Sequence, residues 1–335
     1  MKPTAPNKIK VAFIYGYEPS GHMMAAKAVC DFMPEIIEPY FFNLSGIYPR
    51  LGPFVAKTYL EVLHKTPALW SYVYDKVSLF NAAKRIKSTL TPFYASKLQE
   101  LLLKKGISAA VSTHALSSIL LSKKRGKLKN ISHFVVLTDF YAHNYWPKEG
   151  IELYFAPDND TGRSLTEKGI DKNKIRISGI PVKKDFLSIT SCQQAKRNLG
   201  LNPVLPCILI TGGTKGLGSI EDIFEKACEH EKLQIIVLCG TNQKLHARLK
   251  KKSQNKKRIV ITGFSCETAR YYMAADIVIG KPGGVTIAET LALRKTLAVF
   301  SPLPGQEEKN AEFLKKHKLA WHLKNQRQLA EFLAN

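Results

Sequence analysis

Short apolar runs rich in β-branched residues recur along this chain, and they limit its fold more than any other feature. Helical patterns separate the runs. Each run is apolar throughout instead of alternating with polar residues, which indicates strands that are buried on both faces. Parallel strands covered by helices on both sides have this pattern, so the sequence predicts an α/β protein. The runs are Lys8–Tyr15, Ile107–Thr113, His133–Thr138, Ile175–Ile180, Cys207–Thr211, Leu233–Cys239, Arg258–Thr262, Asp276–Gly280 and Thr296–Phe300.

The series of runs starts afresh near residue 182, which divides the chain in two. There Gly179-Ile-Pro-Val is followed by charged residues 183–185 and by an unpatterned stretch up to Leu205. A chain of 335 residues is also too long for one core of the commonest size. We therefore expect two doubly wound, Rossmann-like domains, residues 1–182 and 183–335, that face a central cleft. The predicted helix Gln326–Leu333 could pack back onto the first domain.

The charge balance restricts the partners of this folded surface. Lys and Arg number 50 against 27 Asp and Glu, a formal net charge of +23. A hydrophobic content of 45% excludes a disordered basic tail or a histone-like chain. The positive charge therefore belongs to a folded surface that attracts anions. Composition alone leaves nucleic acid, an anionic membrane and phosphorylated small molecules as partners.

One basic, aromatic segment departs from the alternation of strand and helix. Residues 47–80 are rich in aromatics, and a helical stretch rich in Lys and Leu follows at 82–105. Residues 84–129 hold eleven Lys or Arg and a single acid, Glu100. Such helices can dock on an anionic bilayer, or they can pack their aromatics into the core and leave a solvated basic face. A second basic run, Lys244–Arg258, is interpreted as a solvated helix and loop.

The cysteines and the apolar segments give no sign of a metal centre or a membrane span. The six cysteines form no C-x-x-C pair and are expected to be reduced, mostly buried thiols. No segment reaches about 18 uninterrupted apolar residues, so membrane contact is expected to be peripheral. Asp158-Asn-Asp160 has the D-x-D form of metal-dependent glycosyltransferases, but it follows a first-domain strand. We predict a loop and a helix N-cap there, and no metal.

The turn after the first strand holds the first candidate for chemistry. It runs through Ser20 and Gly21 to His22, where a helix over Met23–Phe32 is predicted to begin. Such a turn presents backbone N–H groups to a ligand at the carboxyl edge of the sheet. The helix dipole disfavours imidazolium at this position, so His22 is a candidate general base at neutral pH.

Two glycine-rich turns in the second domain are candidate phosphate sites. The turn at residues 211–219 precedes a helix near Ile220, and Lys281-Pro-Gly-Gly opens a helix over Val285–Leu293. Neither matches a Walker loop or a dinucleotide fingerprint. Glu289 lies about one turn into the second helix, where its carboxylate could accept hydrogen bonds from two ribose hydroxyls. A third turn, residues 304–310, places Gln306 and Asn310 on one helix face, suited to sugar hydroxyls.

Together these motifs resemble one glycosyltransferase family. It contains plant monogalactosyldiacylglycerol synthases, bacterial processive diacylglycerol glucosyltransferases and, more distantly, the peptidoglycan N-acetylglucosaminyltransferase. The resemblance covers most of the chain and is most specific over residues 262–311. The motifs that carry it are Ser20-Gly-His22-x-x-Ala-Ala26, Thr66-Pro-Ala-Leu-Trp70 with Tyr74, Thr113-His114, Thr138-Asp139-Phe with His143 and Trp146, Gly179-Ile-Pro-Val, the Gly212–Gly218 loop, Thr262-Gly-Phe264, Ala275-Asp276, Lys281-Pro-Gly-Gly-x-Thr286-x-x-Glu289, and Gly305-Gln-Glu307 with Asn310-Ala311.

The resemblance implies a GT-B fold and inverting, metal-independent transfer of a hexose from a UDP-sugar to a diacylglycerol-type lipid, without a cofactor. His22 matches the family's candidate base, and Asp139, His114, His143 and Trp146 match positions near the acceptor; the sequence does not decide between His22 and Asp139. The implied donor contacts are Gly21 in the first domain, Gly213 and Thr214 for phosphate, Gly263, Phe264 and Ser265 for uracil, Gly283, Gly284 and Thr286 for the diphosphate, Glu289 for ribose, and Gln306 with Glu307 for the sugar.

The expected location is the cytoplasmic face of the cell membrane, with an anionic lipid surface as partner and no specific nucleic acid. One departure from the family is Pro19 in the first turn, which leaves acceptor preference open. The alternatives are a UDP-N-acetylhexosamine transferase acting on a polyprenyl-linked or other lipid, a related UDP-N-acetylglucosamine 2-epimerase, and a non-catalytic membrane-binding or RNA-binding protein on the same fold.

Overall fold

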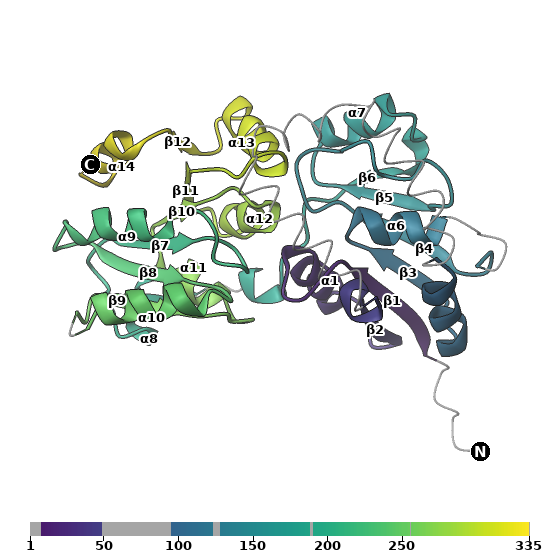
Figure 1. Cartoon of the computed structure of the whole chain (residues 1–335), viewed down its shortest axis with the longest axis horizontal. Coiled ribbons are helices and arrows are strands. Elements are labelled where there is room, and N and C mark those ends of the chain that lie inside the picture. Colours follow the sequence, from purple (N-terminus) through teal and green to yellow (C-terminus); the bar gives the residue numbers. More distant parts are fainter. Residues whose placement is uncertain (1–7, 49–94, 123–127, 188–189, 255, 335) are drawn as a thin grey trace, which may run out of the picture. The chain divides into compact units, whose positions relative to one another are not determined.

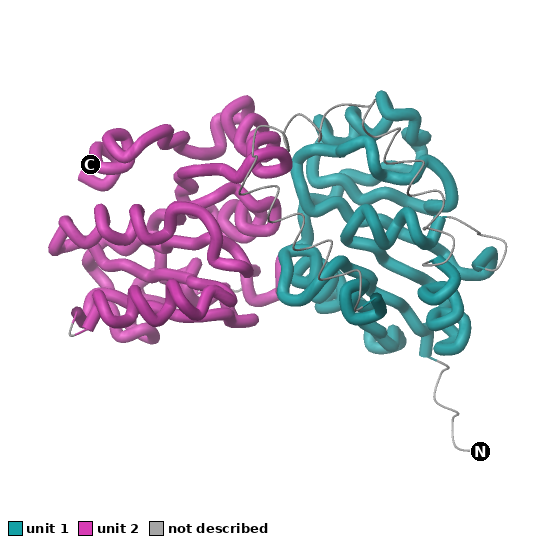
Figure 2. Tube along the Cα trace, in the orientation of Figure 1, with its two compact units in different colours: residues 1–181 teal, residues 182–335 magenta. Residues whose placement is uncertain are grey.

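A computed structural model describes residues 8–48, 95–122, 128–187, 190–254 and 256–334. The chain divides into two compact units, residues 1–181 and 182–335, coloured separately in Figure 2. Each unit is built on one sheet of six strands, and all strand pairs in both sheets are parallel (Figure 1). The α/β class expected from the apolar runs is therefore confirmed.

The first unit has the strand order β2-β1-β3-β4-β5-β6. Its core lies between this sheet and the helices packed on it, and the last five residues of β1 are all buried. The strands are β1 (Ile9–Tyr15), β2 (Ile37–Asn43), β3 (Ala109–Ser112), β4 (Ser132–Val136), β5 (Leu153–Ala156) and β6 (Ile175–Ile177), and the helices are α1 (Gly21–Asp31), α2 (Leu44–Ile47), α6 (Ala115–Ser122), α7 (Asn159–Glu167) and the 3₁₀ turn η2 (Lys172–Lys174).

The second unit has the strand order β12-β11-β10-β7-β8-β9, the order of a dinucleotide-binding Rossmann sheet. Its strands are β7 (Cys207–Thr211), β8 (Gln234–Leu238), β9 (Ile259–Thr262), β10 (Ile277–Gly280), β11 (Thr296–Phe300) and β12 (Trp321–Leu323). Its helices are η3 (Lys184–Leu187), α8 (Cys192–Asn198), α9 (Ile220–Cys228), α10 (Gln243–Lys252), α11 (Ala269–Ala274), α12 (Gly284–Ala292), α13 (Gln306–Lys316) and α14 (Gln326–Ala334).

Helices cover both faces of this second sheet, which explains why its strands are apolar at every position. Ile208 and Ile210 of β7 pack with α9, α10 and α14 in one cluster. Leu209 lies between them in sequence and so points to the opposite face, yet it is also fully buried. Strands β7 and β8 are buried at all five of their positions.

Every predicted run contains a strand, but three strands escaped the sequence analysis. β2 contains Glu38 and Pro39 and lies at the edge of its sheet, so its residues are only partly buried. β5 has four residues, and β12 is a three-residue edge strand whose Trp321 is 61% exposed. The stretch before Leu205 was also thought unpatterned. It contains α8, whose N-cap Ser191 accepts a hydrogen bond from the Gln194 N–H.

The predicted membrane-docking segment lies mostly outside the described residues. Residues 49–94, which include Thr66–Trp70 and Tyr74, and the basic residues 123–127 are among those not described. Residues 95–105 are helical, and Ala95, Leu98 and Leu102 of this helix are buried in the core of the first unit. That apolar face therefore packs inside the protein. Among the described helices, none is long and apolar enough to cross a membrane.

The second basic run forms α10 and the loop after it, as expected, but its cations are less free than a solvated face implies. Arg248 Nη2 lies 2.8 Å from Glu221 Oε2, and Lys252 pairs with both Glu221 and Glu225 of α9. These ion pairs join α9 to α10. The hydrogen bonds from Arg248 and Lys252 lower the pKa of Glu221.

Gly216 is a residue on which the fold of the second unit depends. Its φ is +59°, and a Cβ placed there would lie 2.0 Å from the Cys239 carbonyl oxygen. We predict that Gly216→Ala destabilises the protein by about 3–5 kcal/mol, through left-handed strain and overpacking together. Gly200 is the matched control, since its φ is +73° but nothing lies within 4 Å. Gly200→Ala should cost only about 1–2 kcal/mol.

Thermal unfolding of the two variants beside the wild type measures the difference. Equal losses in the two variants would show that the close approach to Cys239 contributes nothing.

Candidate active site

Both units gather their loops at a topological switch point. Because all strands are parallel, their carboxyl ends lie at one edge of each sheet. In the first unit the order in which the chain adds strands to the sheet reverses between β1 and β3. In the second unit it reverses between β7 and β10. Ligands of open α/β sheets bind outside the carboxyl ends at such points. The turns predicted to carry chemistry follow these strands.

Ser20 sets the start of α1 and with it the position of His22. The Ser20 hydroxyl oxygen accepts from the Met23 N–H at 3.1 Å and donates to the Tyr17 carbonyl at 2.7 Å. This cap begins the helix at Gly21, two residues before the predicted start, because Ser at an N-cap satisfies an amide of the first turn. His22 is thus the second residue of α1.

His22 is packed against a second histidine. The rings of His22 and His114 meet edge to face with centroids 4.7 Å apart, and the Thr113 hydroxyl donates to the His22 carbonyl at 2.9 Å. Burial and the neighbouring His114 and His143 hold the pKa of His22 well below 6.5. Its imidazole is therefore neutral at pH 7. Among the described residues, no group hydrogen-bonds to the buried Nδ1 of His22.

His114 has its orientation fixed by the backbone. It follows β3, and its Nδ1 accepts from the Leu116 N–H at 3.2 Å. A Cβ on Gly16 would lie 3.3 Å from His114 Cδ2, so glycine after β1 makes room for this ring. An Nδ1 that accepts leaves the proton of a neutral ring on Nε2.

The other residues predicted to lie near the acceptor follow β4, the next strand of the sheet. Asp139 is half-buried in the turn after this strand. His143 stacks on Trp146 with centroids 5.2 Å apart and planes 3° apart, and its Nδ1 accepts from the Tyr145 N–H at 3.2 Å. The structure therefore places His22, His114 and Asp139 after β1, β3 and β4, three adjacent strands at one edge.

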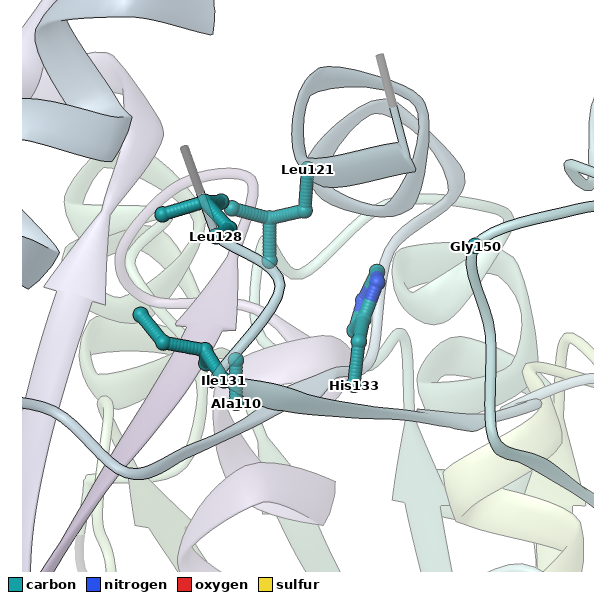
Figure 3. A pocket seen from close by; sticks show the side chains of 6 residues that line it. All are labelled: Ala110, Leu121, Leu128, Ile131, His133 and Gly150. Carbon is teal, nitrogen blue, oxygen red and sulfur yellow. The ribbon is translucent and has the colours of Figure 1, made fainter. Parts of the chain in front are cut away.

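A small hollow in the first unit lies away from this edge. His133 projects into it from the start of β4 (Figure 3). Ser112 Oγ lies 2.9 Å from His133 Nε2. Both side chains are buried. The hollow is mainly apolar and sits at the amino half of β3 and β4, so we assign it to the core. Its lining residues are Ala110, Leu121, Leu128, Ile131, His133 and Gly150.

The first glycine turn of the second unit is a compact backbone structure. The Gly213 N–H donates to Thr211 Oγ1 at 3.2 Å, and the Gly216 N–H to the Gly213 carbonyl at 3.0 Å. The Thr214 carbonyl is bound by the Thr241 N–H at 2.9 Å, which ties the turn to the end of β8. Gly213 has a φ of +66°.

The second glycine turn starts α12 and brings in a cation. Gly283 is the N-cap, and among the described residues no side chain caps the first amides of the helix. A Cβ on Gly283 would lie 3.8 Å from both Lys281 Nζ and Thr286 Oγ1. Gly284 and Thr286 are buried in the first turn of the helix. The ammonium of Lys281 forms an ion pair with Glu307 of α13.

Glu289 is a buried carboxyl group one turn further along α12. It is 7% exposed, and burial raises its pKa to about 8, although a hydrogen bond with Tyr272 and the positive charge of Lys183 act in the opposite direction. Tyr272 is also buried, and its hydroxyl interacts with Thr211 and Thr286 as well. A buried acid with a raised pKa, beside the Tyr272 hydroxyl, is a candidate for a functional group.

The predicted nucleobase loop follows β9 at the edge of the sheet. Gly263, Phe264 and Ser265 form it, and the Phe264 ring is 41% exposed. Ser265 Oγ accepts from the Glu267 N–H at 3.0 Å. Lys183 donates to the Cys266 carbonyl at 3.2 Å and so holds the loop. Its positive charge also favours the ionised form of Glu289. The sequence analysis had assigned Lys183 only to the interdomain linker.

The third turn differs from its prediction at Asn310. This side chain is fully buried and donates to the Pro282 carbonyl at 3.0 Å. It therefore anchors α13 to the second glycine turn, and it does not share an exposed sugar-binding face with Gln306. Gln306 is the half-buried first residue of α13, and Glu307 Oε2 accepts from the Leu303 N–H at 3.0 Å.

The D-x-D sequence forms a helix cap, as predicted. Asp158 Oδ1 accepts from the Thr161 N–H at 3.0 Å and starts α7, and Asp160 pairs with Arg163 in the first turn. Within the described part of the chain, no three potential metal ligands come together.

Two family profiles match the chain. Residues 22–182 match the monogalactosyldiacylglycerol (MGDG) synthase profile, and residues 207–335 match the glycosyltransferase family 28 C-terminal domain. The first begins at His22, and the second contains every predicted donor-binding residue of the second unit.

Individual proteins agree with these profiles. The glycosyltransferase YkoN of Bacillus subtilis is 30% identical over 84% of this chain and 74% of its own length. A processive diacylglycerol β-glucosyltransferase of Bacillus pumilus is 26% identical over 94% of this chain and 83% of its own.

The fold is shared with solved structures. One is the S. aureus MnaA–UDP structure, with a TM-score of 0.58 and 12% identity over 97% of this chain and 87% of that one. The expected GT-B fold class is thus confirmed. Together with the sequence matches, it shows that the chain belongs to the glycosyltransferase family of the monogalactosyldiacylglycerol synthases and processive diacylglycerol glucosyltransferases.

Proposed function

We propose that this protein transfers a hexose from a UDP-sugar to a diacylglycerol-type lipid at a membrane surface, with inversion and without a metal. The observation that carries the proposal is the cluster at the β7/β10 switch point. There the Lys281 ammonium lies beside the glycine turn that opens α12, the first amides of α12 have no side-chain cap in the described residues, and the buried Glu289 follows within the same helix. These groups complement the ribose and diphosphate of a nucleotide sugar.

Residues 183–335 bind the donor in this proposal. Glu289 accepts from the ribose hydroxyls, while the amides around Gly284 and Thr286 and the turn at Gly213 and Thr214 hold the diphosphate. The loop of Gly263, Phe264 and Ser265 holds the uracil. Gln306 and Glu307, at the start of α13, face the hexose.

Residues 1–182 supply the acceptor side and the base. An inverting transfer needs a base that removes the proton of the attacking hydroxyl as the bond to the anomeric carbon forms. His22 suits this task because its pKa is lowered, so it is neutral at pH 7. Its Nδ1 is buried and has no hydrogen-bond partner in the described residues, so the hydrogen-bonding capacity of this nitrogen is unused there. Asp139 remains the second candidate.

The leaving UDP gains negative charge, which the protein must stabilise. We assign this role to the N-terminus of α12 and to Lys281, whose ammonium lies against both glycine turns. These groups do what a divalent cation does in other glycosyltransferases.

The acceptor is inferred from the relatives. The matched profile is that of a monogalactosyldiacylglycerol synthase, and a relative is a processive diacylglycerol glucosyltransferase. A lipid acceptor requires the enzyme to work at a bilayer. The net charge of +23 favours a surface of anionic lipid.

Replacing His22 should separate the base from donor binding. We expect His22→Ala to lower turnover roughly 10²–10⁴-fold, the usual contribution of a general base. Affinity for UDP should change little, because His22 lies in the first unit. Steady-state rates and calorimetric titration with UDP measure the two effects. Turnover near that of the wild type would exclude His22 as the base, and Asp139→Asn would then be tested in the same way.

The raised pKa of Glu289 predicts that donor binding depends on pH. Ribose hydroxyls donate to a carboxylate, so binding favours the ionised form and expels the proton held below a pKa of about 8. UDP-hexose affinity should therefore rise with pH and level off above that value. Calorimetry at pH 7 in two buffers of different ionisation enthalpy should show net proton release in the wild type and none in Glu289→Gln. Binding without proton release would contradict the ribose role.

The same residue changes stability in a defined direction. The folded pKa is above the ordinary value of 4.5, so the folded state retains a proton that the unfolded chain gives up between those values. The contribution of Glu289 to the free energy of unfolding therefore falls as pH rises from about 4.5 to 8. Thermal unfolding of Glu289→Gln should depend less on pH in this window than that of the wild type.

The product identifies the reaction. Purified protein would be given diacylglycerol in anionic vesicles with UDP-glucose, UDP-galactose or UDP-N-acetylglucosamine in turn. We expect a hexosyl lipid by mass spectrometry from one of the first two donors and none with His22→Ala. A product only from UDP-N-acetylglucosamine on a polyprenyl-linked acceptor would overturn the proposed substrates, and free sugar release alone would overturn the lipid transfer.

A further inference from the structure

Lys281 and Glu307 form an ion pair between two turns that the proposed function assigns to different parts of the donor. Lys281 lies in the diphosphate turn that opens α12, and Glu307 lies in the first turn of α13, beside the hexose. Figure 1 shows α12 and α13 together in the second unit. Asn310 joins the same two turns through the Pro282 carbonyl, so their separation is fixed.

The pair is largely removed from water. Each side chain is 13% exposed, in contrast to another ion pair of α13, Lys309 with Glu312, at 27% and 68%. Removing one member of a largely buried pair leaves the other charge uncompensated, which is costly. Each of these two groups therefore needs a partner of opposite charge or a strong hydrogen-bonding partner at all times.

The Lys281 ammonium has donors to spare and points toward the ligand side. Glu307 is its one hydrogen-bond partner within the described residues, although an ammonium carries three N–H donors. A Cβ on Gly213 would lie 3.4 Å from Lys281 Nζ, and one on Gly283 would lie 3.8 Å from it. A diphosphate cradled by these turns would therefore meet the ammonium.

We propose that Lys281 and Glu307 exchange partners when the donor binds. In the empty site each neutralises the other. In the occupied site the diphosphate takes Lys281, and the released Glu307 oxygen accepts from a hexose hydroxyl. The second Glu307 oxygen keeps its bond to the Leu303 N–H, which holds the carboxylate in place during the exchange. Diphosphate binding thus prepares the site for the sugar. The inference rests on the proposed donor site and makes Glu307 a specificity residue of it.

The exchange gives Glu307 opposite effects on two ligands. UDP must break the ion pair but gains nothing from Glu307, so the pair weakens UDP binding. A UDP-hexose breaks the same pair and recovers a charge-assisted hydrogen bond to the sugar. Glu307 therefore increases the preference of the site for the intact donor over the spent nucleotide, and it helps UDP to leave after transfer.

Glu307→Gln tests this prediction, because glutamine keeps the shape and can still accept from the Leu303 N–H. By calorimetry, UDP should bind about threefold to tenfold more tightly than to wild type, since the ion pair that competes for Lys281 is lost. The preference for UDP-glucose or UDP-galactose over UDP should fall about tenfold or more, as one charged hydrogen bond disappears. UDP binding that is unchanged or weaker would overturn the exchange.

Lys281→Met shows whether the gain passes through Lys281. In that background UDP should bind about tenfold or more weakly, and adding Glu307→Gln should give no further gain. An equal gain in both backgrounds would mean a general charge effect and would overturn the proposal. Glu312→Gln is the matched control, an exposed acid on the same helix that should leave both affinities unchanged.

Two further results keep the outcomes distinct. If the wild type binds neither UDP nor a UDP-hexose, the proposed function is wrong. If the wild type binds both tightly and Glu307→Gln weakens both, the partner exchange is wrong but the proposed function stands. Should Glu307→Gln not fold, Glu307→Asp repeats the test, because its shorter side chain cannot reach both Lys281 and the Leu303 N–H. UDP should again bind more tightly, and weaker binding would overturn the exchange.

Discussion

The parallel direction of the strands is the constraint from which the rest of this structure follows. A parallel sheet needs helical crossovers, and these cover both faces, so the strands must be apolar throughout. The carboxyl ends of the strands then lie at one edge of the sheet. The helix N-termini also lie at this edge, so the polar turns between strand and helix come together there. In each unit the switch point opens a gap between two such turns. His22 and His114 meet at one, and Gly213 and Lys281 at the other.

Close backbone contact keeps the second switch point compact. The Thr211 carbonyl oxygen would lie 2.0 Å from a Cβ on Gly280, and the Thr214 carbonyl oxygen 2.4 Å from one on Gly240. Glycine is required at such distances because any side chain would displace the neighbouring strand end. The result is a floor of backbone amides and carbonyls with few side chains above it. Lys281 and Glu289 lie beside these turns, where Lys281 pairs with Glu307 and Glu289 contacts Tyr272.

The sequence predicted the features that depend on local pattern. The buried strands, the Asp158 cap and the glycine turns all follow from residue type and spacing. It missed what depends on partners far along the chain. Asn310 was predicted to bind the sugar, but α13 packs on another turn and buries this side chain against the Pro282 carbonyl. Lys183 read as linker because its contact with Cys266 spans 83 residues. The protonation of Glu289 likewise depends on burial that no motif encodes.

Lys196 is buried and Lys281 is largely removed from water, but the two ammonium groups are held in different ways. Lys196 is 4% exposed, pairs with Asp276 at 2.8 Å and also donates to the Leu205 carbonyl at 2.8 Å. Asp276 in turn accepts from the Cys207 N–H, so every member is committed to partners within the protein. Burial of this charge fixes α8 on the sheet and offers no site to a ligand.

Lys281 is held differently. Its carboxylate partner lies on another turn, its remaining donors have no partner among the described residues, and the backbone beside it is glycine. When the site is empty, Glu307 compensates the charge of the Lys281 ammonium. An anion of greater charge could then compete with Glu307 for this ammonium. That combination would let the proposed nucleotide site hold a positive charge when it is empty, because an unpaired buried charge is costly.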